Sequence, residues 1–130
     1  RFKIRVAAET SLGEQRGEPA DEAARVELGW PRLGSEIAPG ETIPAGTGVT
    51  GLAVSFTQGC YPGQELVERM DSRAADAPRS LRRLIVPEGA ASGDPVVDDG
   101  DEVGVLTSVA GGRALGWVKR ASGLGEIVQF

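Results

Sequence analysis

The sequence predicts an α+β protein, with a mixed helical portion over residues 1–77 and a small antiparallel β-barrel over residues 78–130. Two observations predict this division. Helix start and stop residues punctuate the first part, whereas short runs rich in Val, Leu and Ile alternate with close turns after Pro78. A polar, Ala-rich connection, residues 71–78, lies between the two patterns and marks the predicted domain boundary.

The first portion predicts one strand and two helices. Residues 2–6 alternate between apolar and cationic side chains, which is typical of a strand with one buried face. Residues 19–28 are expected to be helical, because proline suits a first turn and Gly29 can take the left-handed cap. A second helix is expected over about residues 62–71, and the apolar residues 52–56 are expected to be extended.

The barrel is expected to consist of short strands joined by tight turns. Five runs carry the strand pattern: residues 81–86, 95–97, 102–109, 113–119 and 126–130. Turn-forming stretches such as 98-DDGD-101 and 111-GG-112 separate them, so we expect six antiparallel strands or a similar number. Arginines around the first run, Arg82 among them, are expected to face solvent, with contact to an acidic partner as the alternative.

The composition excludes several kinds of chemistry and partner. The 130 residues include no histidine, so neither a Ser-His-Asp or Cys-His pair nor a His-ligated metal can form within the chain. A single cysteine cannot hold an iron–sulfur cluster by itself, and no metal site is predicted. The net charge of −5 argues against nucleic acid or an anionic membrane as a direct partner.

The only cysteine, Cys60, lies in the stretch 56-FTQGCYPGQELVERM-70, just before the second expected helix. The free N–H groups at a helix N-terminus favour a thiolate, and Gly59 and Gly63 allow the backbone to approach a ligand closely. The alternative is a buried, small apolar residue, because free cysteines are commonly buried. The local residues therefore predict either a reactive thiol on a ligand-binding loop or a packing residue.

Three stretches of the chain have the form of known motifs. The most specific, 58-QGCYPGQE-65, is similar to the Lys-Gly-Cys-Tyr-x-Gly-Gln-Glu signature of the YgfZ family of folate-binding proteins, relatives of the glycine-cleavage aminomethyltransferase (T-protein). The stretch 25-RVELGWPRLGSEI-37 is similar to an upstream segment of that superfamily, and 101-DEVGVLTSVAGGRALGWVKR-120 to the strand pair of its C-terminal barrel. Gln58 stands where lysine is usual, which puts any role of that cation in doubt.

The resemblance, which runs from roughly residue 20 to the end, implies both a fold and a function. Residues 1–77 would be the C-terminal part of a folate-binding domain, and residues 78–130 a barrel of the aminomethyltransferase C-terminal type. It implies tetrahydrofolate as cofactor, and support for the assembly or repair of iron–sulfur clusters and, through client proteins, for tRNA modification. Iron–sulfur client or assembly proteins would be the partners. Cys60 would be the functional thiol, surrounded by Gly59, Tyr61, Gly63, Gln64 and Glu65.

Two other functions remain open. The first is a true aminomethyltransferase, which transfers a one-carbon unit to tetrahydrofolate, but such proteins usually have a Phe-Ile-Gly-Lys-like string where this chain has Cys60. The second is a barrel-bearing fragment used only for protein contacts. For Glu65 alone, a simpler role is to stabilise the first turn of its own helix.

The sequence also leads to two expectations about the protein from which it comes: the part of that protein it represents, and the cellular location. It has no initiator methionine and begins within the expected strand at residues 2–6, so we expect a C-terminal fragment or a processed product. Residues upstream of the fragment would then complete the folate site. A lone cysteine, which cannot form an internal disulfide, fits a reducing, cytoplasmic setting.

Overall fold

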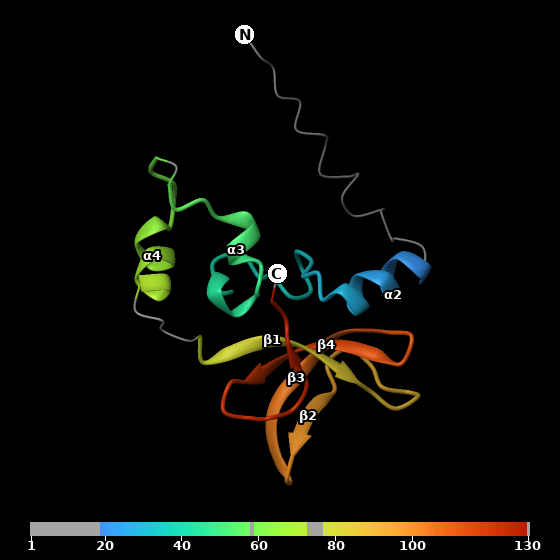
Figure 1. Cartoon of the computed structure of the whole chain (residues 1–130). Helices are drawn as coiled ribbons and strands as arrows, with labels where there is room; N and C mark the ends of the chain where they lie inside the picture. The colour runs from blue at the N-terminus through green and yellow to red at the C-terminus, as the bar shows by residue number, and fades with distance from the viewer. Residues whose placement is uncertain (1–18, 58, 73–76, 130) are drawn as a thin grey trace.

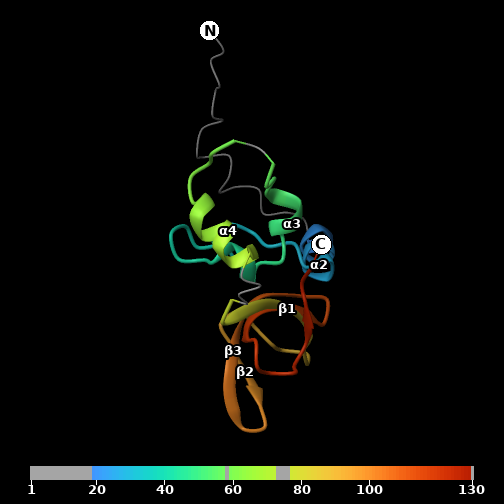
Figure 2. The ribbon, with the colours of Figure 1, turned by 60° about the vertical axis from the view of Figure 1, so that its left-hand side comes forward.

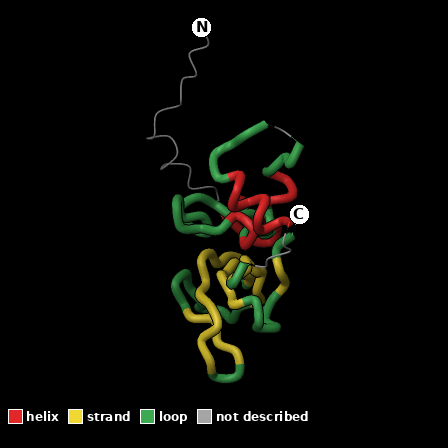
Figure 3. The backbone as a smooth tube through the Cα atoms, turned by 90° about the vertical axis from the view of Figure 1, so that its left-hand side faces the viewer, coloured by secondary structure: helices red, strands yellow, loops and turns green. Residues whose placement is uncertain are grey.

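A computed structural model describes residues 19–57, 59–72 and 77–129 of the chain. The strand expected at residues 2–6 lies outside these residues. The helices gather on one side of the molecule and the strands on the other, as Figures 1 and 3 show. The hairpin of strands β2 (Pro95–Asp98) and β3 (Asp101–Ala110) extends away from the helices, at the opposite end of the molecule.

The two expected helices are present. Helix α2 spans Pro19–Leu28, as predicted, and Gly29 follows it with a φ of 78°, the left-handed conformation expected of its cap. Helix α4 spans Gln64–Ser72 and begins later than the expected start at Pro62. The reason is Gly63, whose φ of 83° belongs to the turn before the helix rather than to the helix itself.

The connection between these helices contains two short helical elements. The 3₁₀ helix η1 spans Pro44–Gly46, and helix α3 spans Thr50–Ala53. The prediction of an extended segment over residues 52–56 is therefore wrong at its start. The N–H groups of Leu52 and Ala53 both donate to the carbonyl oxygen of Val49, so the chain closes a helical turn before it extends at Val54.

The second half forms one antiparallel sheet of five strands. The strands are β1 (Arg79–Ile85), β2 (Pro95–Asp98), β3 (Asp101–Ala110), β4 (Arg113–Lys119) and β5 (Glu126–Ile127). Their order in the sheet is β2-β3-β4-β1-β5, so each of the five predicted runs supplies one strand. Because β2 and β5 form the two edges, the structure shows a small antiparallel β domain but not a closed barrel.

A bulge in β3 divides its side chains between two cores. The register against β4 shifts between Leu106 and Ser108, which in a regular strand would point to the same face. Leu106 instead packs with Val96, Ala114 and Val118 in an inner core away from the helices. Ser108 faces the helical side, where it meets polar groups of the first half of the chain.

A second core joins the helical layer to the sheet. Val26 of α2 packs with Leu81, Leu115 and Val128, and all four are at most 2% exposed. Burying a side chain of this size contributes about 1.5–3 kcal/mol. Val128 lies in the C-terminal segment that rises from β5 toward the helices in Figures 1 and 2, so both ends of the described chain meet at this core.

A buried carboxylate holds the loop after α2 against the sheet. Glu36 is 1% exposed, and its Oε1 accepts hydrogen bonds from the hydroxyls of Ser108 (2.6 Å) and Thr107 (2.7 Å). Its Oε2 accepts from Nη1 of Arg25 (3.0 Å) and from the backbone N–H of Arg32 (2.9 Å). A buried charge is tolerated only when its lone pairs are satisfied in this way.

Arg25 extends this network to the helix surface. Its guanidinium donates to both carboxylate oxygens of Glu22, at 2.6 and 3.0 Å. The hydrogen bond from Arg25, with the positive charges of Arg25 and Arg32, outweighs partial burial and lowers the pKa of Glu22. Burial opposes the charge of Arg25, but its bonds to Glu22 and Glu36 prevail and raise its pKa.

The expectation that Arg82 faces solvent is wrong. Its residue is only 3% exposed, and its guanidinium donates to the carbonyl oxygens of Leu124 (2.7 Å) and Arg120 (3.1 Å). Burial, together with the neighbouring charge of Arg120, lowers the pKa of Arg82. Arg82 therefore fixes the turn between β4 and β5 from inside, where strand periodicity alone predicts a surface residue.

Candidate functional site

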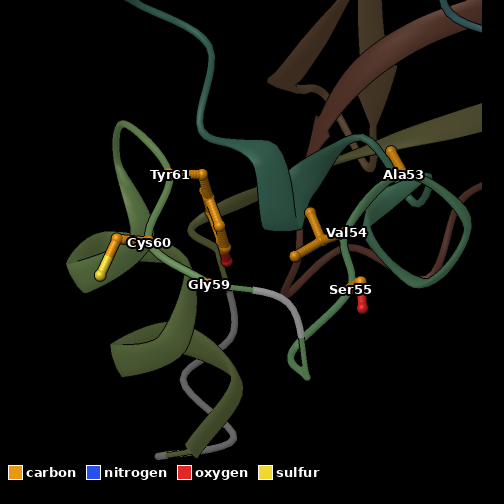
Figure 4. A pocket seen from close by; sticks show the side chains of 6 residues that line it. All are labelled: Ala53, Val54, Ser55, Gly59, Cys60 and Tyr61. Atoms are coloured by element: carbon orange, nitrogen blue, oxygen red, sulfur yellow. The ribbon is translucent and has the colours of Figure 1, made fainter.

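The predicted thiol lies beside a cavity formed by two short segments of the chain. The cavity has a volume of about 610 Å³ and is lined by residues 53–55, at the end of α3, and residues 59–61. Figure 4 shows the two segments facing each other across it, with Tyr61 directed between them. Volumes of 300–1,000 Å³ are usual for small-molecule sites.

Cys60 is exposed to solvent, so its interpretation as a buried packing residue is wrong. Its side chain is directed away from Val54 and Ser55 in Figure 4. The thiol therefore lies at the outer margin of the cavity rather than at its base. An exposed sulfur at such a margin can reach a bound molecule and also a second protein.

Tyr61 provides the polar group inside this region. The residue is half-buried, and its hydroxyl oxygen is buried without a hydrogen-bond partner among the described residues. A buried hydroxyl left unpaired costs about 1–3 kcal/mol. A ligand atom that hydrogen-bonds this hydroxyl would remove that cost, which makes Tyr61 the strongest candidate for a polar contact in the cavity.

The other three predicted site residues do not line the cavity. Gly63 supplies the carbonyl oxygen that accepts the first hydrogen bonds of α4, from the N–H groups of Leu66 and Val67. The side-chain amide of Gln64 donates to Glu68 at 2.6 Å, within the same helix. Glu65 is exposed in the first turn of α4, the position where an acidic side chain stabilises its own helix.

The structure thus brings together Gly59, Cys60 and Tyr61, and it adds a wall that sequence reasoning missed. Ala53, Val54 and Ser55 form this wall, and their residue types carry no chemical signal of their own. The helical turn of α3 directs this segment toward residues 59–61. Its only signal in the sequence is the Gly-rich stretch before it, which permits tight turns.

Metal-binding clusters and membrane-spanning helices are both absent from the described part of the chain. It contains no group of three or more His, Cys, Asp or Glu side chains that could hold a metal ion. Among its helices, none has both the length and the apolar character needed to cross a membrane.

Comparison with known proteins gives a partial match to a named protein. No protein-family model matches the sequence. Over 57 residues it is 42% identical to a protein of Chaetomium globosum named iron-sulfur cluster assembly factor IBA57 homolog, mitochondrial. The aligned part is 44% of this chain and only 13% of that protein. That relative is named as mitochondrial, whereas the location expected from the sequence is cytoplasmic, and this expectation stays a prediction.

Proposed function

We propose that this chain belongs to a tetrahydrofolate-binding protein of the YgfZ type, which supports the assembly or repair of iron–sulfur clusters through Cys60. The observation that carries the proposal is the similarity to a named iron–sulfur cluster assembly factor. The cysteine octapeptide 58-QGCYPGQE-65 agrees with it, as does the exposure of the thiol. Client or assembly proteins of the iron–sulfur pathway are the proposed partners, and effects on tRNA modification would follow from such clients.

The thiol is suited to work with a second protein. One cysteine supplies one sulfur ligand, whereas iron–sulfur clusters are held by several. Cys60 is the only cysteine of the chain and is exposed, so any cluster it contacts must take its other ligands from a partner. In this proposal the cluster is cargo that passes between proteins, and Cys60 is the point at which this chain touches it.

The residues fit tetrahydrofolate in part. The cavity has room for a ring system, and the unpaired hydroxyl of Tyr61 can bond a heteroatom of a ligand. The space beside Gly59 is open, because a Cβ placed on this residue would have no heavy atom within 4 Å. A ligand could therefore approach the backbone of Gly59 closely. Tetrahydrofolate supplies one-carbon chemistry when bound, and these residues would hold one part of it. Gln64, already bonded within α4, is the weakest of the proposed contacts.

Rescue of cells lacking the native protein tests the role of Cys60. We expect the full-length protein to restore the activity of an iron–sulfur enzyme and the Cys60→Ser variant to fail. A matched control moves the thiol: Cys60→Ser combined with Ala91→Cys places an exposed sulfur on the connection between β1 and β2. This double variant should also fail. Full rescue by Cys60→Ser would refute the proposed role of the thiol.

Folate binding needs its own measurement. Calorimetry on the full-length protein should show tetrahydrofolate binding that Tyr61→Phe weakens by about five- to tenfold, the effect of losing one hydrogen bond of about 1–1.5 kcal/mol. If no heat of binding is detected at any tetrahydrofolate concentration, the proposal that this protein binds folate is refuted. The role in cluster assembly would then be judged from the rescue experiment alone.

A further inference from the structure

A second cavity lies on the helical side of the sheet, apart from the one beside Cys60. It has a volume of about 490 Å³ and is bounded by the loop over residues 35–43 and by β3 and β4. Trp117 and Val105, which pair across those strands, form the sheet wall, and Ile43 contributes an apolar side chain from the loop. The two cavities have no lining residue in common.

The walls of this second cavity are held in place by the fold. The indole N–H of Trp117 donates to the carbonyl oxygen of Glu36 at 3.1 Å. Gly46 lies so close to the indole that a Cβ there would stand 2.9 Å from the ring. The hydroxyl of Thr42 accepts from the N–H of Ala38 at 2.8 Å and closes the loop. The cavity is therefore formed before any ligand arrives, which reduces the entropy cost of binding.

Two opposite charges line this cavity without pairing. Arg79, the first residue of β1, and Glu41, on the loop, are both exposed lining residues. Within the described part of the chain, neither side chain has an ion pair or a hydrogen bond, and they do not pair with each other. The cavity thus combines an apolar, aromatic wall with one available cation and one available anion.

We propose that this cavity binds a small zwitterion with an apolar body, such as an amino acid with an aromatic or large aliphatic side chain. The apolar body would pack on Trp117, Val105 and Ile43. Its carboxylate would meet Arg79 and its ammonium group Glu41. A ligand with only one charge would gain from one of these groups and be repelled by the other. The inference goes beyond the proposed function, because it uses none of the residues around Cys60.

Three probes with the same ring separate the contributions of the two charges. L-Phenylalanine carries both charged groups, phenylacetate lacks the ammonium group, and phenethylamine lacks the carboxylate. Each is titrated into the full chain, and the indole N–H signal of Trp117 is followed by NMR in a Trp30→Phe background. We expect phenylalanine to bind about two- to fivefold more tightly than either of the others, the range for an exposed ion pair.

Two variants assign the charges to their residues. Arg79→Gln should weaken phenylalanine and phenylacetate and leave phenethylamine unchanged or tighter. Glu41→Gln should weaken phenylalanine and phenethylamine but not phenylacetate. The same spectra report whether each variant is folded, and the three-probe comparison on the unaltered residues stands without the variants. Equal affinity for the three probes, tighter binding of a singly charged one, or an unmoved Trp117 signal overturns the proposal.

Discussion

The hydroxyl of Ser108 donates a 2.6 Å hydrogen bond to Oε1 of Glu36, across 72 positions of sequence. The contact depends on the bulge in β3, which turns Ser108 toward the helical side while Leu106 stays in the inner core. The other carboxylate oxygen accepts from Arg25 of α2 at 3.0 Å. One buried side chain therefore connects a helix, a loop and the central strand pair.

Replacing this carboxylate should weaken the whole domain. In Glu36→Gln an amide N–H₂ takes the place of one oxygen, so the buried network loses a hydrogen-bond acceptor, while Arg25 loses its buried counter-charge. We expect the free energy of unfolding to fall by about 2–4 kcal/mol. Urea unfolding measures the loss. The matched control is Glu41→Gln, exposed on the same loop, which should change stability by about 0.5 kcal/mol or less. Equal losses in the two variants would mean that the buried network contributes no stability.

Glu22 should make part of this stability depend on pH. Arg25 lowers the pKa of Glu22 in the folded state below its ordinary value of 4.5. A carboxyl whose pKa is depressed by folding binds its proton more readily in the unfolded state. Its contribution is therefore complete above about pH 4.5 and is lost as pH falls through the lower, folded pKa.

The measurement compares unfolding of the unaltered protein with that of Glu22→Gln at several pH values. The stability difference between them should be constant near neutral pH and should shrink below about pH 4.5. A difference that stays constant down to acid-induced unfolding would contradict the assignment of this dependence to Glu22.

The elements with strong local signals were predictable, and the long-range contacts were not. Helix α2 and the five strands follow from caps, turns and apolar runs in their own residues. The burial of Arg82 and Glu36 has no local signature, because their partners lie on other elements. The same limit applies to the candidate site: residues 59–61 follow from the octapeptide, whereas the facing wall at residues 53–55 depends on tertiary placement. The division at residue 77 stays a prediction.

Two glycines with nearly the same backbone conformation should respond very differently to substitution. Gly48 and Gly40 have φ values of 78° and 77°, in the left-handed region. Alanine at either position is therefore destabilised by a similar conformational strain of about 1–2 kcal/mol. At Gly40 a Cβ meets nothing within 4 Å, but at Gly48 it would overlap the backbone carbonyl of Val128. That carbonyl belongs to the segment that closes the core joining helices and sheet.

We therefore expect the free energy of unfolding of Gly48→Ala, measured in urea, to be lower than that of Gly40→Ala by about 1–3 kcal/mol, the usual cost of overpacking. Because strain is common to both variants, their difference isolates the clash with the C-terminal segment. Equal stability of the two would show that residues around Val128 can move aside freely.

Cys60 should be dispensable for folding and fully open to reagents. The residue is exposed at the margin of its cavity, so replacing sulfur by oxygen removes no core packing. We expect Cys60→Ser to change the free energy of unfolding by about 0.5 kcal/mol or less.

We also expect iodoacetamide to modify Cys60 in the folded protein at a rate close to that in urea. The matched comparison is Cys60→Ser combined with Ala114→Cys, since Ala114 is 0% exposed and a thiol there should react only after opening of the structure. A slow reaction of Cys60, or a large loss of stability in Cys60→Ser, would show that the thiol contributes to packing after all and would remove the structural basis for its contact with a partner.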